Sequence, residues 1–191
     1  MKQKQLFIPF VMATVLVLLT TFSCNKNTKS EQASIYITLR TDEEVLMDVR
    51  GRVSEMAGKA HARISTQDMA GPDEHTIKKN TVSVVAYVIA DPKSDKMQSL
   101  VITVPSVTGP GTYDIVALDG LLVYSDSQGE GMVGWEVSSE TSTSHGTLHI
   151  EKIGNDELPG LGKAVMGTFS VNAKSLDGTT REFSGSFDGG V

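Results

Sequence analysis

The sequence predicts a mainly β protein, an antiparallel β-sandwich or open barrel of about nine strands that follows an N-terminal signal peptide. From Ser34 onward, apolar residues recur at every second position in short successive runs, the period of a strand with one buried face. Fifteen of the eighteen glycines lie within residues 96–191, between these runs, where they suit turns. Short strands joined by short breaks favour antiparallel pairing over a parallel sheet with helical crossovers.

The most apolar run covers residues 81–90 and is apolar on both faces, which is typical of a central strand. Residues 100–104 have the same character. Tyr113, Ile115 and Ala117 share one face of the next run, and the turn-favouring dipeptide Asp119-Gly120 separates that run from residues 121–124. Three further runs alternate, with in-phase residues Val133, Trp135 and Val137, then Phe169, Val171 and Ala173, and finally Arg181, Phe183, Gly185 and Phe187.

Residues 42–57 fit two different elements. Thr41 and Glu44 have the spacing of a helix capping box, and the residues on one helical stripe are Val45, Leu46, Val49, Val53 and Met56. The same segment also alternates as a strand, and Gly51 would cost a helix about 1 kcal/mol. We therefore favour strands here and in residues 60–65, and one helix near 42–57 is the alternative.

The N-terminus has the parts of an export signal. Two lysines precede an uncharged run over residues 6–23, which contains Pro9 and is shorter than the about 20 apolar residues of a membrane-spanning helix. Thr21-Phe22-Ser23-Cys24 resembles the lipobox of bacterial lipoproteins, although Thr21 occupies the place where Leu, Val or Ile is usual. The resemblance implies that residues 1–23 are a signal peptide and that Cys24 is lipidated, for example with palmitate.

We therefore expect three parts: the signal peptide, a flexible tether over residues 24–33 that begins at lipidated Cys24, and a single β-rich domain over residues 34–191. Cys24 is the only cysteine, so an intramolecular disulfide is excluded. Neither an aspartate directly after Cys24 nor an acidic cluster is present in the tether. We therefore expect an outer-membrane lipoprotein that faces the periplasm, with surface exposure as the alternative.

The charge balance excludes one class of partner. The formal net charge is −6, and it becomes −8 without the two lysines of the signal peptide. No basic cluster is present, so we expect no binding to nucleic acid. The expected contact with a membrane is through the lipid anchor.

Several short motifs resemble a family of uncharacterised lipoproteins of the Bacteroidota. They are residues 56–60 (MAGKA), 111–113 (GTY), 146–150 (GTLHI), 167–173 (GTFSVNA) and 184–187 (SGSF). The resemblance spans about residues 53–187 and implies a small β-sandwich in the cell envelope. It implies no catalytic residue, because the family has no established activity.

We expect neither a metal site nor a cofactor. On a strand, His145 and His149 would lie about 13 Å apart, too far to share one metal ion, and His61 and His75 belong to separate segments. Residues 126–131 (DSQGEG) resemble part of a calcium loop, but the twelfth position is valine instead of glutamate. A polar hairpin turn is the preferred interpretation there and in the loop around residues 155–157, and a weak calcium site is the alternative at both.

No nucleophile stands out, because the chain has no Gly-x-Ser-x-Gly motif and its one cysteine is expected to carry lipid. Trp135 is the only tryptophan, and we expect it in the core because Val133 and Val137 share its face. A sugar-binding platform is the alternative for this residue.

The leading hypothesis is a non-catalytic binding module with a protein or glycan ligand in the envelope. The alternatives are an envelope hydrolase, acting on glycan or peptide through carboxylates that folding brings together, and a structural component of an outer-membrane assembly.

Overall fold

The computed structural model describes residues 33–56, 58–70, 76–91, 96–127, 132–140, 144–158, 162–175 and 177–191. Within these ranges every regular element is a strand, and the strands pair antiparallel. The strands are β1 (Ser34–Arg40), β2 (Val45–Arg52), β3 (Ala60–Ala70), β4 (Thr76–Asp91), β5 (Lys96–Val104), β6 (Gly111–Asp114), β7 (Leu121–Ser127), β8 (Met132–Val137), β9 (His145–Leu158), β10 (Gly162–Ser175) and β11 (Thr180–Asp188).

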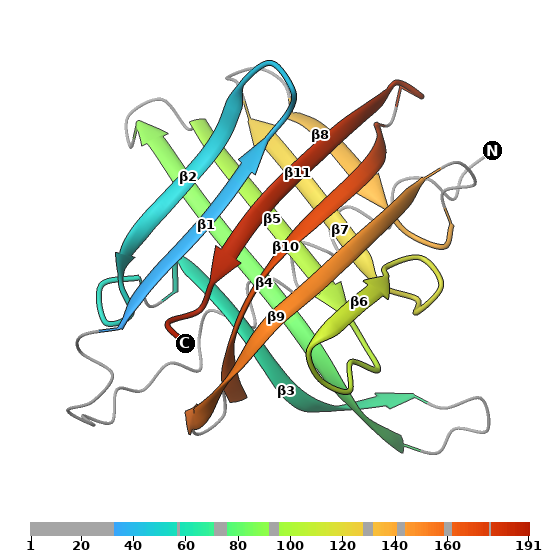
Figure 1. The fold of residues 1–191 in the computed structure, drawn as a ribbon. Coiled ribbons are helices and arrows are strands. Elements are labelled where there is room, and N and C mark those ends of the chain that lie inside the picture. Colours follow the sequence, from blue (N-terminus) through green and yellow to red (C-terminus); the bar gives the residue numbers. More distant parts are fainter. Residues whose placement is uncertain are drawn as a thin grey trace.

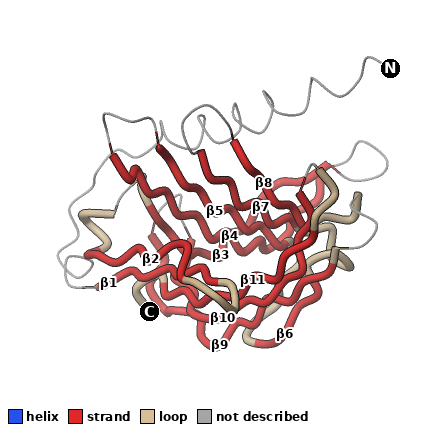
Figure 2. The backbone as a smooth tube through the Cα atoms, turned by 90° about the horizontal axis from the view of Figure 1, so that it is seen from above, coloured by secondary structure: helices blue, strands red, loops and turns tan. Residues whose placement is uncertain are grey.

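The strands form two facing layers (Figure 1). One layer has the order β2-β1-β11-β10-β9-β6, and the other has the order β3-β4-β5-β7-β8. The strands of the first layer cross diagonally in front of those of the second in Figure 1, and Figure 2 shows the layers stacked. Strand β10 joins the layers, because it pairs with β3 at Ala164 and with β8 at Ser175. The predicted antiparallel sandwich or open barrel is confirmed.

The core lies between the layers and is built by the alternation visible in the sequence. On β4, Val82, Val84 and Ala86 are completely buried and point inward. Strand β4 lies between β3 and β5, which confirms the predicted central strand. The opposite layer contributes a second set of buried side chains, which includes Ile37, Leu39, Phe169, Val171, Phe183 and Phe187.

Residues 34–52 form a hairpin of β1 and β2, so the preferred strand interpretation is confirmed and the helix near 42–57 is wrong. Thr41 Oγ1 accepts hydrogen bonds from the backbone N–H of Glu43 and Glu44, as a helix cap would, but here these bonds close the hairpin loop. Pairing with β1 buries Met47 and Val49 against the core. A helix could not make these ladder hydrogen bonds.

Two further expectations are wrong. Residues 115–119 form a turn instead of the continued strand, because the Asp114 side chain accepts from the N–H of Ala117 and the Asp114 carbonyl accepts from Leu118. The turn before Gly120 and the strand from Leu121 are confirmed, although β6, which precedes this turn, pairs with β9 and not with β7. Residues 155–157, expected in a loop, belong to strand β9.

The predicted signal peptide and Cys24 lie outside the described residues. Among the residues that the structure does describe, no helix is long and apolar enough to cross a membrane.

Candidate functional site

The inward-facing side of the sandwich changes from apolar to polar at one end. On β5, the inward-facing residue after the buried Leu100 is the polar Gln98. On β7, the inward-facing residue after the buried Tyr124 is Asp126. On β11 the inward-facing series ends with Arg181 after the buried Phe183. The register places Gln98 opposite Asp126, so the polar ends of β5 and β7 lie side by side. Polar groups therefore line a position that a closed sandwich would fill with apolar side chains.

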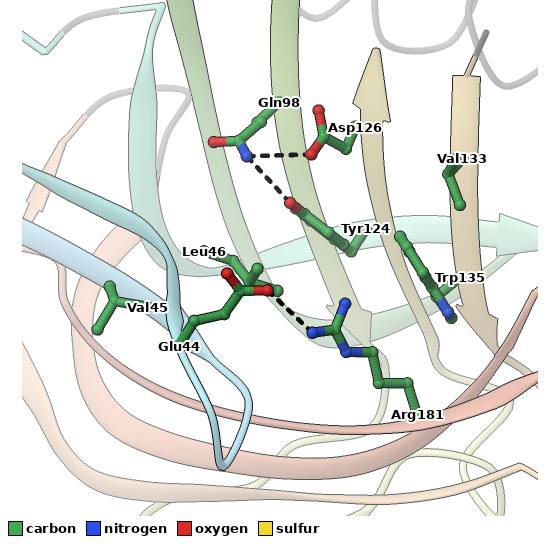
Figure 3. Close-up of a pocket in the computed structure, with 9 residues that line it drawn as sticks. All are labelled: Glu44, Val45, Leu46, Gln98, Tyr124, Asp126, Val133, Trp135 and Arg181. Carbon is green, nitrogen blue, oxygen red and sulfur yellow. Dashed lines mark hydrogen bonds and ion pairs between the residues drawn. The ribbon is translucent and has the colours of Figure 1, made fainter. Parts of the chain in front are cut away.

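These residues surround a hollow of about 240 Å³, which we call the aromatic hollow (Figure 3). Its walls come from both layers, so it forms only when the layers are brought together. It is lined by Glu44, Val45, Leu46, Gln98, Tyr124, Asp126, Val133, Trp135 and Arg181.

Two aromatic residues, Tyr124 and Trp135, line the hollow, and Phe183 packs against both of their rings. Tyr124 and Trp135 are cross-strand partners on β7 and β8, and their rings stack with centroids 5.7 Å apart. Phe183 reaches them from β11, with centroids 5.7 Å from Tyr124 and 5.6 Å from Trp135. These separations lie within the favourable range for aromatic pairs. Tyr124 and Phe183 are almost completely buried, so the cluster is a rigid continuation of the core.

A hydrogen-bond network forms the polar wall above Tyr124. Gln98 Nε2 donates to the Tyr124 hydroxyl at 3.2 Å and to Asp126 Oδ2 at 3.3 Å. Burial, together with the nearby charge of Asp126, raises the pKa of Tyr124 to about 12. The phenol therefore stays protonated at neutral pH and can donate a hydrogen bond.

An ion pair closes the opposite wall. Arg181 Nη2 lies 3.0 Å from Glu44 Oε1, which joins β11 to the loop before β2. The guanidinium carbon of Arg181 also lies 5.9 Å from the ring centroids of Trp135 and Phe183, within cation–π range. Glu44 is more than half exposed, so the ion pair itself contributes at most about 1 kcal/mol to stability. Its main effect is to hold Arg181 beside the rings.

Trp135 packs against the core as predicted, but it is only partly buried and also lines the aromatic hollow. Burial of the inward-facing residues decreases along β8. Val137 is completely buried, Trp135 is partly buried, and Val133 is 47% exposed. The core prediction is therefore confirmed for the part of the ring that packs against the core, and the sugar-platform alternative stays a prediction.

Four residues of the hollow, Gln98, Glu44, Tyr124 and Arg181, were not predicted as site residues from the sequence. Gln98 had a usable signal, because it is a polar residue in phase with the buried side chains of its strand. Glu44 had none, since its approach to Arg181 depends on how the β1–β2 hairpin packs in three dimensions.

The described residues that were considered as metal ligands do not come together. His145 and His149 are both exposed on β9, and Nδ1 of His149 lies 2.9 Å from Thr112 Oγ1. Asp126 belongs to strand β7, whereas residues 128–131 of the calcium-like segment lie outside the described residues. In the described ranges, no three His, Cys, Asp or Glu side chains are grouped closely enough to hold a metal ion.

No protein-family model matches the chain, and no curated protein or solved structure matches it either. The resemblance to Bacteroidota lipoproteins therefore stays a prediction, and the geometry of the aromatic hollow is the main basis for a functional proposal.

Proposed function

We propose that this chain is a lipid-anchored, non-catalytic binding protein of the bacterial cell envelope, and that its domain binds a small ligand in the aromatic hollow. The anchor and the address rest on the sequence signals at residues 1–24. The binding role rests on one observation: inward-facing polar side chains border a partly open aromatic cluster at the end of the sandwich.

The hollow has the general composition of a small-molecule site. Such sites combine apolar and aromatic walls with a few well-placed polar groups. Here Trp135 and Val133 supply apolar surface, and Gln98, Asp126 and Arg181 supply hydrogen-bonding groups. A volume of about 240 Å³ lies below the roughly 300–1,000 Å³ of sites for drug-sized ligands. The occupant is therefore a small molecule or the end of a larger one.

A hydrolase is the second candidate, because two carboxylates line the same hollow. However, Glu44 accepts from Arg181, and Asp126 accepts from Gln98. Glu44 is also largely exposed, whereas catalytic carboxylates act best in sites that exclude water. Turnover of glycosides or peptides that is lost in both Glu44→Gln and Asp126→Asn would favour the hydrolase.

Thermal unfolding of the purified chain with a panel of monosaccharides, amino acids, nucleosides and dicarboxylates tests the binding role. A ligand at one hundred times its Kd stabilises the folded state by about 2.7 kcal/mol. For a chain of this size, that corresponds to a rise in Tm of roughly 5–10 °C.

The variant Val133→Tyr provides the site-specific control, because a larger side chain at this exposed rim position would fill the hollow. Ile89→Tyr is the matched control, since Ile89 is also an exposed strand residue but does not line the hollow. We expect the rise in Tm to disappear in Val133→Tyr and to persist in Ile89→Tyr. Equal rises in both variants, or no rise with any class, would contradict the proposal.

A further inference from the structure

We propose that the outer side of strands β3 and β4 holds a second binding site, in which the guanidinium of Arg63 binds a singly charged carboxylate. This site goes beyond the proposed function, because none of the described residues that line the aromatic hollow belongs to β3 or β4. The proposal follows from a charged side chain that is buried without a partner.

Arg63 lies on the side of β3 that faces away from the core. Its neighbours Ala62 and Ile64 pack with the core, so the period of two along a strand directs Arg63 outward. The register pairs Arg63 with Ser83 on β4 and with Ala164 on β10. Arg63 therefore lies between two neighbouring strands, each of which places a short side chain beside it.

The guanidinium of Arg63 lacks a counter-ion. Arg63 is only 7% exposed, yet within the described part of the chain it makes no ion pair and no side-chain hydrogen bond. Burial lowers the pKa of Arg63, and no described carboxylate opposes that shift. An arginine nevertheless keeps its charge at neutral pH. Because buried charges in folded proteins are ordinarily paired, this unpaired charge points to a bound anion.

The guanidinium of Arg63 is within reach of a ligand. Among the described residues, the side-chain polar atoms that are sealed from solvent and lack a partner are Thr81 Oγ1 and Asn172 Oδ1, so the Arg63 nitrogens are not sealed. Beside Arg63, Ser83 Oγ lies 3.2 Å from His61 Nε2. A serine hydroxyl that accepts from this imidazole can donate its own proton to an anion. Arg63 and Ser83 therefore supply neighbouring donors on one side of the sheet.

The charge around Arg63 favours an anion with a single charge. His61 lies on the same side of β3, about 7 Å along the strand from Arg63. Burial, together with the charge of Arg63, keeps the pKa of His61 near 4, so this imidazole is neutral at neutral pH. A carboxylate presents two oxygens to the planar guanidinium and balances its one charge. A phosphate dianion would leave one negative charge unbalanced, on a chain whose formal net charge is already −6.

NMR titration of the purified chain tests the site, and the side-chain Nε–H signal of Arg63 is the readout. The probes are acetate, N-acetyl-trialanine, its C-terminal amide and phosphate, each added at pH 7 and constant ionic strength. We expect acetate and N-acetyl-trialanine to shift the signal until it saturates, and the amide to leave it unchanged. We expect phosphate to bind more weakly than acetate. Tighter binding of the peptide than of acetate would identify the ligand as a peptide C-terminus, and equal affinities would identify it as a free carboxylate.

Two variants locate the site. Arg63→Lys keeps the charge but loses the planar pair of donors, so we expect it to weaken acetate binding about fivefold or more. Arg40→Lys is the matched control, because Arg40 is exposed on β1, and it should leave the binding unchanged.

Three results would overturn the proposal. If no carboxylate shifts the Arg63 signal of the unsubstituted chain, Arg63 does not bind this class of ligand, and this result does not depend on how well a variant folds. Acetate binding that Arg63→Lys does not weaken would place the site elsewhere. Tighter binding of phosphate than of acetate would overturn the ligand class. The aromatic hollow is tested separately, by Val133→Tyr.

Discussion

His61 shows how a single side chain can make stability depend on pH. Its neighbours Ala60 and Ala62 point into the core, so His61 points to the outer side of β3, where Nε2 lies 3.2 Å from Ser83 Oγ. Burial, together with the charge of the nearby Arg63, lowers the pKa of His61 to about 4. The folded protein therefore keeps this imidazole neutral in mildly acidic solution.

The direction of the effect follows from proton binding. An unfolded histidine titrates near pH 6.5, so between about pH 6.5 and 4 the unfolded chain binds more protons at this site than the folded chain does. The stability contribution is complete above pH 6.5 and is lost as the pH falls toward 4. A shift of this size corresponds to at most about 3 kcal/mol.

We therefore expect His61→Gln to reduce the loss of unfolding free energy between pH 7 and pH 4.5, because an amide has no charge to gain. Chemical denaturation at the two pH values measures this difference. His149→Gln is the matched control, since His149 is exposed, and it should keep the pH dependence of the unsubstituted protein. An unchanged pH dependence in His61→Gln would show that burial does not hold this histidine neutral.

At the scale of elements, the strands could be predicted because alternation is a local property of the sequence. In segments 100–104 and 169–173, a period of two correctly predicts which side chains are buried. The same alternation also carried an unused signal for the site, because Asp126 and Arg181 lie in phase with Tyr124 and Phe183, which are buried. A polar residue in phase with the core marks a place where the core ends.

Pairing partners could not be predicted, because they depend on contacts between distant segments. Gly185 lies in phase with Phe183 and Phe187, but its role appears only when β1 pairs with β11. A Cβ on Gly185 would lie 2.1 Å from the Thr38 carbonyl oxygen, so only glycine allows this approach. Residues 115–119 likewise alternate like a strand, yet hydrogen bonds to Asp114 fold them into a turn.

In the whole molecule, we expect the two layers and the predicted anchor to have separate roles. The layers meet through β10, and the aromatic hollow depends on both, since Arg181 and Glu44 belong to one layer and Trp135 to the other. All the described residues that line the hollow follow the predicted anchor, Cys24, in the sequence. We therefore expect membrane attachment and ligand binding to be separable.

The variant Cys24→Ser tests the anchor, because a hydroxyl cannot replace the thiol in the thioether bond to lipid. Labelling of expressing bacteria with a fatty acid should modify the unsubstituted chain and leave Cys24→Ser unlabelled and released from the membrane fraction. Ligand-dependent thermal stabilisation should be the same in both proteins. Persistent label on the serine variant would mean that Cys24 is not the lipidated residue.

Fluorescence quenching of Trp135 can show directly whether an open aromatic hollow lies at the end of the sandwich. Trp135 is the only tryptophan, so its emission reports on the hollow alone. We expect emission at shorter wavelength than that of an exposed indole, because the ring packs against Tyr124 and Phe183. We also expect acrylamide, a small neutral amide, to quench it to an intermediate degree.

Val133→Tyr should reduce this quenching and Ile89→Tyr should leave it unchanged, because only the first position borders the hollow. That combination of results would show that small polar molecules reach Trp135 through the rim. Emission that acrylamide does not quench would place Trp135 in a sealed core, and quenching equal to that of free tryptophan would place it on an open surface. Either of these two results would contradict the account.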